Sequence, residues 1–179
     1  MSTSGLTSAS ASASASRESA PFAGYSPEEE KPLGGYAILM GAFASLAGLF
    51  AAWFRRSGRE LPDRIDAADM ALVTVASHKA ARLIAKDKVT SAIRAPFAQY
   101  EGPAGPGEVS ERPRGRGLRR VVGELLICPY CLGMWTSAGL TAGLLVAPRF
   151  TRWVCTVLGA FFGADVLQIA YKRAEQGLG

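Results

Sequence analysis

The chain has 179 residues, of which 49% are hydrophobic, and its 20 basic and 15 acidic residues give a net charge of +5. This length suits a single domain, and the overall composition is close to the globular average. The distribution of apolar residues is more informative, because residues 33–54 and 125–147 are two long runs without a charged side chain. A helix of roughly 20 apolar residues crosses the hydrocarbon core of a bilayer. The sequence therefore excludes an ordinary soluble enzyme.

Residues 1–32 form a Ser- and Ala-rich tail that we expect to be disordered, because it has too little apolar surface to offset its ordering entropy. The first transmembrane helix is predicted over residues 33–54, where small residues recur at four-residue spacing and allow close helix contact in lipid. A second helix is predicted over residues 66–86, with Asp66 or Asp63 as its N-cap. It is short and amphipathic, and it either spans the bilayer or lies in the interface.

Residues 87–124 are expected to form a basic, flexible loop, because the stretch 101–117 contains five glycines and three prolines. Basic loops beside membrane helices mark the cytoplasmic side. Two further transmembrane helices are predicted over residues 125–147 and 151–172, joined by a very short turn as a tight hairpin. The expected fold is thus an all-α membrane protein with three to four hydrophobic helices, multi-pass in the bacterial inner membrane.

Cys128-Pro-Tyr-Cys131 is the sharpest motif in the chain. Two cysteines three residues apart at a helix start lie on one face, and the free amides of the first turn favour a thiolate. At a cytoplasmic membrane face we expect the pair to be reduced. Three uses remain open: structural packing, thiol-redox chemistry, and a zinc site completed by His78 with Asp165 or Glu124.

A second set of polar residues lies near the same membrane face. Asp165 is the only charge within residues 153–171, so it should face the helix bundle with Arg82 or His78 as its partner, either as a structural contact or as a proton or ion relay. The charged bend that contains Asp87 and Arg94 should fold back against the helix ends. The candidate polar cluster consists of Arg82, Asp87, Arg94, Glu124 and Asp165, beside Cys128, Cys131 and His78.

These features favour an integral membrane scaffold or accessory protein without evident catalytic activity and without a resident cofactor. The alternative is a membrane thiol-redox or zinc-binding protein that uses Cys128 and Cys131. The expected partners are the bilayer, anionic lipid headgroups, and a protein partner or a second copy of the chain. Nucleic acid is not expected, because the arginines of residues 112–120 have no aromatic side chains among them for base stacking. A transporter is disfavoured, because no pair of Gly/Pro-broken helices falls near the bilayer midplane.

Two blocks, HKAARLIAKDKVTSAIRAPF (78–97) and GELLICPYCLGMW (123–135), resemble the signature of an uncharacterised family of small bacterial membrane proteins. The family is catalogued as domain of unknown function thirteen-sixty, with members in Bacillus, actinobacteria and phages. The matching residues are Arg82, Asp87, Arg94, Pro96 and Phe97 in the first block, and Gly123, Glu124, Cys128, Pro129, Cys131, Gly133 and Trp135 in the second. The resemblance covers about residues 66–172, so that 1–55 are an addition. It implies membrane placement, and the sporulation names of some relatives imply an envelope role in a spore-forming organism. It supplies no reaction or ligand.

Overall fold

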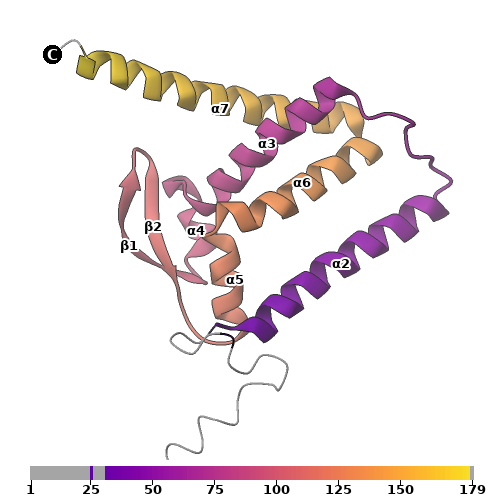
Figure 1. The fold of residues 1–179 in the computed structure, drawn as a ribbon, viewed down its shortest axis with the longest axis horizontal. Helices are drawn as coiled ribbons and strands as arrows, with labels where there is room; N and C mark the ends of the chain where they lie inside the picture. The colour runs from indigo at the N-terminus through magenta and orange to yellow at the C-terminus, as the bar shows by residue number, and fades with distance from the viewer. Residues whose placement is uncertain (1–24, 26–30, 178–179) are drawn as a thin grey trace, which may run out of the picture.

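The structure is a computed structural model that describes residues 25 and 31–177 (Figure 1). Its helices are α2 (Leu33–Arg56), α3 (Ala67–Ala85), the 3-10 turn η2 (Lys88–Thr90), α4 (Ser91–Arg94), α5 (Leu118–Leu126), α6 (Pro129–Val146) and α7 (Pro148–Gly177). Strands β1 (Ala98–Gly105) and β2 (Glu108–Pro113) form a hairpin between α4 and α5. We call residues 87–126, from η2 to α5, the head. The disorder expected for residues 1–32 falls mostly outside the described residues.

The head lies at one end of the long helices (Figure 1). At this end, the hydroxyl of Tyr36 in the first turn of α2 donates a hydrogen bond to Glu124 of α5 at 2.5 Å. Ala85, the last residue of α3, packs in one apolar cluster with Leu132 of the first turns of α6. The start of α2, the end of α3 and the start of α6 are therefore neighbours of the head.

The opposite ends of the same helices are also in contact. Arg59, just after α2, donates a hydrogen bond to the carbonyl of Val146 at the end of α6, at 3.2 Å. Asp69 in the first turn of α3 accepts two hydrogen bonds, of 2.8 and 2.7 Å, from Arg152 in the first turns of α7. Helices α2 and α6 thus lead away from the head, and α3 and α7 return to it.

Helix α3 forms as the sequence indicates: the Asp66 side chain caps it by accepting a hydrogen bond from the amide of Ala68 at 3.0 Å. The helix expected over residues 125–147 is broken instead. Cys128 is extended, and α5 meets α6 at 81°. The cause is Pro129, which disfavours helical backbone at the residue before it but suits the first turn of a new helix.

The last two helices are joined through Ala147 alone and contact one another, and α3 packs more extensively against both of them (Figure 1). Near the connection, Gly143 of α6 faces Thr151 of α7 so closely that a Cβ there would be 2.8 Å from the threonine Oγ1. Farther along α7, Gly159 faces Leu72 and Val75 of α3 rather than α6. Gly159 therefore makes room for α3, whereas Gly163 has open space around its Cβ position.

The flexible loop expected in the head is a β-hairpin, so the fold is not all-α. The strands pair antiparallel from Ala98 opposite Pro113 to Gly105 opposite Glu108. The residues between the strands are Pro106 and Gly107, and Gly107 has φ of +78°. Proline followed by a residue with positive φ is the pattern of a type II turn, so these residues make a tight turn where composition suggested flexibility.

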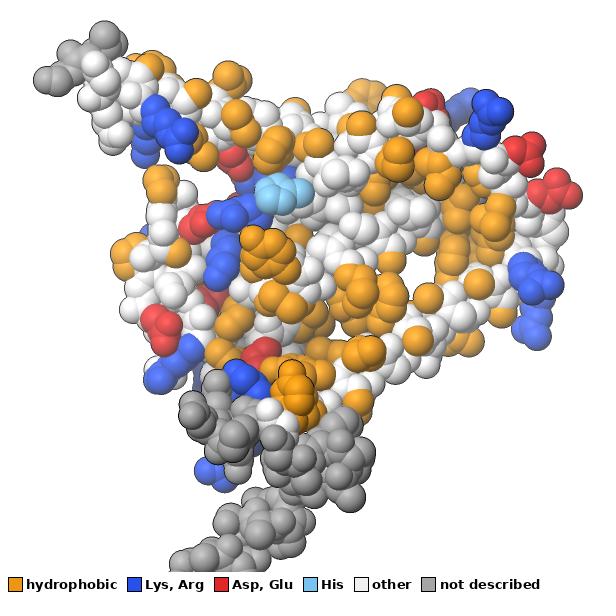
Figure 2. Space-filling model, in the orientation of Figure 1, with side chains coloured by type: hydrophobic (Ala, Val, Ile, Leu, Met, Phe, Trp, Pro, Cys, Tyr) orange, Lys and Arg blue, Asp and Glu red, His pale blue; other side chains and the backbone are white. Residues whose placement is uncertain are grey.

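Two helices of the described chain, α2 and α7, are long and apolar enough to cross a membrane, and the bent α5–α6 pair would be a third such segment. Only 6% of the apolar window of α2 and of α7 is buried within the chain. Figure 2 shows the resulting hydrophobic surface along the helices. These faces are uncovered in the chain by itself, which is the pattern expected when lipid is the surrounding solvent.

Candidate functional site

Asp165 of α7 pairs with Lys79 of α3, a residue that the sequence analysis did not select. The Lys79 Nζ lies 2.7 Å from the Asp165 carboxylate and 3.4 Å from that of Asp87. The same ammonium lies 3.7 Å from the centre of the Phe161 ring. Because the Lys79 side chain is only 5% exposed, two carboxylates and an aromatic face replace the water that it loses.

The two residues expected to pair with Asp165 have other neighbours. Arg82 forms an ion pair with Glu108 at the start of β2, and its Nε lies 3.1 Å from the Glu108 carboxylate. This pair joins the last turn of α3 to the hairpin. The His78 ring lies edge-on to Phe162, with 5.5 Å between the ring centres.

Arg94 is fully buried and organises the head. Its guanidinium donates hydrogen bonds to the carbonyls of Ile84 at 2.6 Å and Asp87 at 3.0 Å, and to the Thr90 hydroxyl at 2.7 Å. It also forms an ion pair with Glu111 of β2. One guanidinium therefore connects the end of α3, the bend after it and the hairpin, which agrees with the bend folding back as expected.

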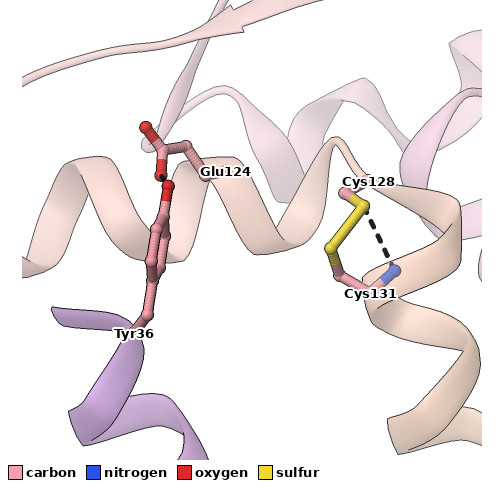
Figure 3. The surroundings of a disulfide bond; sticks show 4 residues. All are labelled: Tyr36, Glu124, Cys128 and Cys131. Carbon is pink, nitrogen blue, oxygen red and sulfur yellow. Dashed lines mark hydrogen bonds between the residues drawn. A yellow bond between two sulfur atoms is a disulfide. The ribbon is translucent and has the colours of Figure 1, made fainter. Parts of the chain in front are cut away.

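Cys128 and Cys131 are joined as a disulfide where α5 turns into α6, rather than being the reduced pair that we expected (Figure 3). Their Cα atoms are 5.3 Å apart, and the Cys131 amide lies 3.1 Å from the Cys128 sulfur, to which it donates a hydrogen bond. Tyr130, between the two cysteines, is 91% exposed. The cysteine pair is thus at an accessible helix start.

The structure does not assemble the zinc site that we considered. Glu124 is directed toward Tyr36 rather than toward the sulfurs (Figure 3). Across the described ranges, no three His, Cys, Asp or Glu side chains come close enough together to hold a metal ion.

A cavity of about 780 Å³ opens between α3, α7 and the turn of the hairpin. Figure 2 shows acidic and basic side chains gathered in this area. Of the predicted residues, the cavity brings together His78, Arg82, Asp87 and Asp165, and it adds three charged residues that we had not selected, Lys79, Glu108 and Lys172. Arg94, Glu124 and the two cysteines do not line it. The single predicted cluster is therefore divided into four parts: a charged cavity, the buried Arg94, Glu124 with Tyr36, and a disulfide.

Comparison with known proteins places this chain in a family context. The family described as "Protein of unknown function (DUF1360)" matches residues 72–171, which include the head, the disulfide and every cavity residue except Lys172. The "Sporulation protein YjcA" of Bacillus subtilis (strain 168) is 28% identical over 112 residues, which cover 61% of this chain and 95% of that protein. No solved structure matches the chain.

Proposed function

The chain belongs to this family of proteins of unknown function, and we propose that it is a multi-pass protein of the bacterial cytoplasmic membrane that acts as a scaffold or accessory subunit. The length and apolar surface of α2 and α7 support membrane insertion. Helices α3 and α6 run between the same two ends as α2 and α7, so they would cross the bilayer with them. In this arrangement the head projects from one face of the membrane.

The charge distribution favours the cytoplasm as the side of the head. Ten lysines and arginines lie at the head end, in residues 86–126 and 172–177, whereas six lie at the opposite end, in residues 55–69 and 147–152. Lys and Arg are enriched on the cytoplasmic side of membrane proteins. The exposed arginines 114, 116 and 119 would then face anionic headgroups or a cytoplasmic partner.

The observation that carries the scaffold role is the pairing of buried and half-buried charges within the chain. Lys79 is paired with Asp165 and Arg94 with Glu111, while Arg82 is paired with Glu108. Satisfied networks of this kind fix one arrangement of the elements that they join. Here they join the head to the last turns of α3 and join α3 to α7, which suits a platform for another protein.

Cysteine accessibility tests the membrane arrangement. The test uses a background with Cys128→Ser and Cys131→Ser. One variant adds Leu61→Cys at the end of the helices opposite the head, and the other adds Tyr100→Cys in the head; both positions are exposed. A membrane-impermeant maleimide should label the first variant in spheroplasts and the second only after lysis. The background protein, which keeps the buried Cys155, is the control. The reverse labelling pattern would overturn the proposed orientation, and equal labelling of both would overturn membrane crossing.

The disulfide favours a second candidate, a membrane thiol-disulfide protein. Disulfides in a reducing cytoplasm are usually transient and serve catalysis or redox sensing. A thiolate of a reduced dithiol partner would attack one sulfur of the Cys128–Cys131 bond and form a mixed disulfide. The second thiol of the partner then displaces the remaining cysteine, so that two electrons and two protons pass to this chain and the partner leaves oxidised.

The two candidates differ in the effect of replacing the cysteines. For a scaffold, Cys128→Ser and Cys131→Ser should leave folding and the recovery of bound partner proteins unchanged. If the chain acts by thiol-disulfide exchange, Cys128→Ser or Cys131→Ser should abolish exchange with the dithiol partner. In membranes whose thiols are first trapped with acid, the wild-type cysteine pair should also gain two alkylation tags after it is reduced with dithiothreitol. A pair that is already fully alkylated before reduction would contradict the resting disulfide from which this exchange starts.

A further inference from the structure

A second cavity lies at the end of α2 that is opposite the head. Its volume is about 440 Å³, and it is formed by the last turns of α2, the segment that follows them, and Leu145 near the end of α6. We call it the α2–α6 cavity. Figure 2 shows that α2 and α6 also leave an opening between them, with hydrophobic side chains around it. Packed interiors leave few voids larger than a water molecule, so a molecule from outside the chain should occupy this space.

The polarity of the α2–α6 cavity changes along α2. Phe50 and Phe54 give it an apolar wall, and Arg55 and Arg59 follow in the direction away from the head. Between Phe50 and Arg55 the helix rises about 7.5 Å, at 1.5 Å per residue. If α2 spans the bilayer, the apolar wall is at acyl-chain depth and the two guanidiniums are at headgroup depth. A phospholipid has its apolar and charged parts in the same order along the membrane normal.

Arg59 is held at the cavity by two uncharged groups. Its guanidinium donates a hydrogen bond to the carbonyl of Val146 at 3.2 Å and lies 5.8 Å from the centre of the Trp53 ring. Neither contact neutralises the positive charge, and a guanidinium has five N–H donors, of which the carbonyl uses one. The position of Arg59 is thus fixed by contacts that leave its charge for an anion.

The charges that line the α2–α6 cavity do not balance one another. Arg55 and Arg59 are both exposed, and neither has an ion-pair partner within the described residues. Glu60 also lines the cavity, and its carboxylate is not within ion-pair distance of either guanidinium. Two positive charges and one negative charge leave one positive charge in surplus. A ligand with a single phosphodiester would compensate it.

We propose that the α2–α6 cavity binds one monoanionic phospholipid, a phosphatidylglycerol, of the leaflet on the side opposite the head. Its phosphodiester lies between Arg55 and Arg59, because the planar guanidinium fits phosphate oxygens in a bidentate manner. One acyl chain lies over Phe50 and Phe54, toward the opening between α2 and α6. A zwitterionic lipid has no net charge and would leave the surplus positive charge uncompensated. The proposal rests on the proposed membrane insertion of α2, but not on which side of the membrane the head occupies.

The binding can be measured on the full-length protein purified in detergent. Dioctanoyl phosphatidylglycerol is titrated in and its binding followed by native mass spectrometry, with dioctanoyl phosphatidylethanolamine as the zwitterionic probe. Arg55→Gln and Arg59→Gln each remove one phosphate partner, and Ala51→Trp fills the cavity. The matched controls are Arg56→Gln and Ala52→Trp, because these neighbouring exposed residues do not line the cavity.

The wild-type protein should bind the glycerol lipid more tightly than the ethanolamine lipid. Arg55→Gln and Arg59→Gln should each weaken its binding about tenfold, the loss expected for a hydrogen bond between charged groups. Ala51→Trp should weaken it at least as much, and both controls should bind like the wild type. Equal binding of the two lipids would overturn the monoanionic assignment. Unchanged binding by Ala51→Trp, or an equal loss in Arg56→Gln, would overturn the site.

Two other occupants of the cavity are distinguished in the same experiment. Free glycerophosphoglycerol has the headgroup alone and should compete only at concentrations far above those of the dioctanoyl lipid, because it lacks the acyl contact with Phe50 and Phe54. Competition at equal concentration would overturn the lipid assignment. A dimer that is lost in Ala51→Trp would show that a second copy of the chain fills the cavity and would also overturn the lipid.

The spheroplast labelling of Leu61→Cys and Tyr100→Cys tests membrane insertion without any variant of the cavity. Equal labelling in that experiment would overturn the membrane proposal, whereas the binding measurements test the lipid site. Failure of the membrane proposal and failure of the lipid site are therefore separate results.

Discussion

The junction of α3 with the head and the attachment of α2 are held by different kinds of contact. At the junction, Lys79 and Arg94 are almost or fully buried and reach carboxylates and carbonyls on several elements. Helix α2 instead keeps only Phe54 buried and contacts its neighbours through Tyr36 and through Phe43, whose ring lies edge-on to Trp135 with 5.1 Å between centres. The junction thus depends on satisfying charges within the chain, whereas most of α2 is uncovered within the described residues.

The largest effect is expected at the buried arginine. Arg94→Met leaves Glu111 without its cation in a buried position, so the free energy of unfolding should fall by about 3–5 kcal/mol. Thermal unfolding in detergent measures this change. The exposed Arg116→Met is the control and should have no effect, and Arg94→Met combined with Glu111→Leu should recover part of the loss. A loss below about 1 kcal/mol would show that the head does not depend on Arg94.

A close approach inside the head gives the next effect. A Cβ at Gly123 of α5 would lie 2.4 Å from the backbone oxygen of Phe97, which cannot move away by rotation. Gly123→Ala should therefore destabilise the protein by about 1–3 kcal/mol in the same unfolding assay. Gly133 of α6 has open space around its Cβ position, so Gly133→Ala should be neutral or stabilising. If the two variants changed the free energy of unfolding equally, the result would contradict the packing of α5 on the base of the hairpin.

The attachment of α2 should respond locally. Tyr36→Phe removes the hydrogen bond to Glu124, and its net contribution is about 0.5–1.5 kcal/mol. Amide hydrogen exchange in residues 33–40 should increase, while exchange in α3 and α7 stays the same. Tyr130→Phe, at an exposed position, is the matched control. Increased exchange throughout the chain would mean that α2 is part of the cooperative core and is not held separately from the junction of α3 with the head.

The smallest effect concerns the ion pair at the end of the helices opposite the head. Asp69 accepts two hydrogen bonds from Arg152, whose side chain is half exposed, so the pair should contribute only about 0.2–1 kcal/mol. Asp69→Asn should therefore lower the melting temperature in detergent only slightly, and the difference from the wild type should shrink at about 1 M salt, where the charges are screened. A difference that grows with salt would contradict the pair.

The sequence by itself determined the features that depend on local patterns. Apolar runs locate α2 and α7, Asp66 caps α3, and the motif blocks indicate the family that the match over residues 72–171 confirms. These signals are read within a helical turn or within one segment, so no tertiary contact is needed to interpret them.

Tertiary structure decided which charged residues meet. His78, Lys79 and Arg82 are close in sequence, but successive residues of a helix are about 100° apart, so only the packing of α3 on α7 selects Lys79 for Asp165. The same holds for the head. Its glycines and prolines indicated a flexible loop, yet Pro106 and Gly107 form a turn whose strands are held through Arg94 and Glu111, a contact made across seventeen residues. Composition indicates how easily the backbone of a segment can turn. Which conformation the segment adopts depends on its long-range contacts.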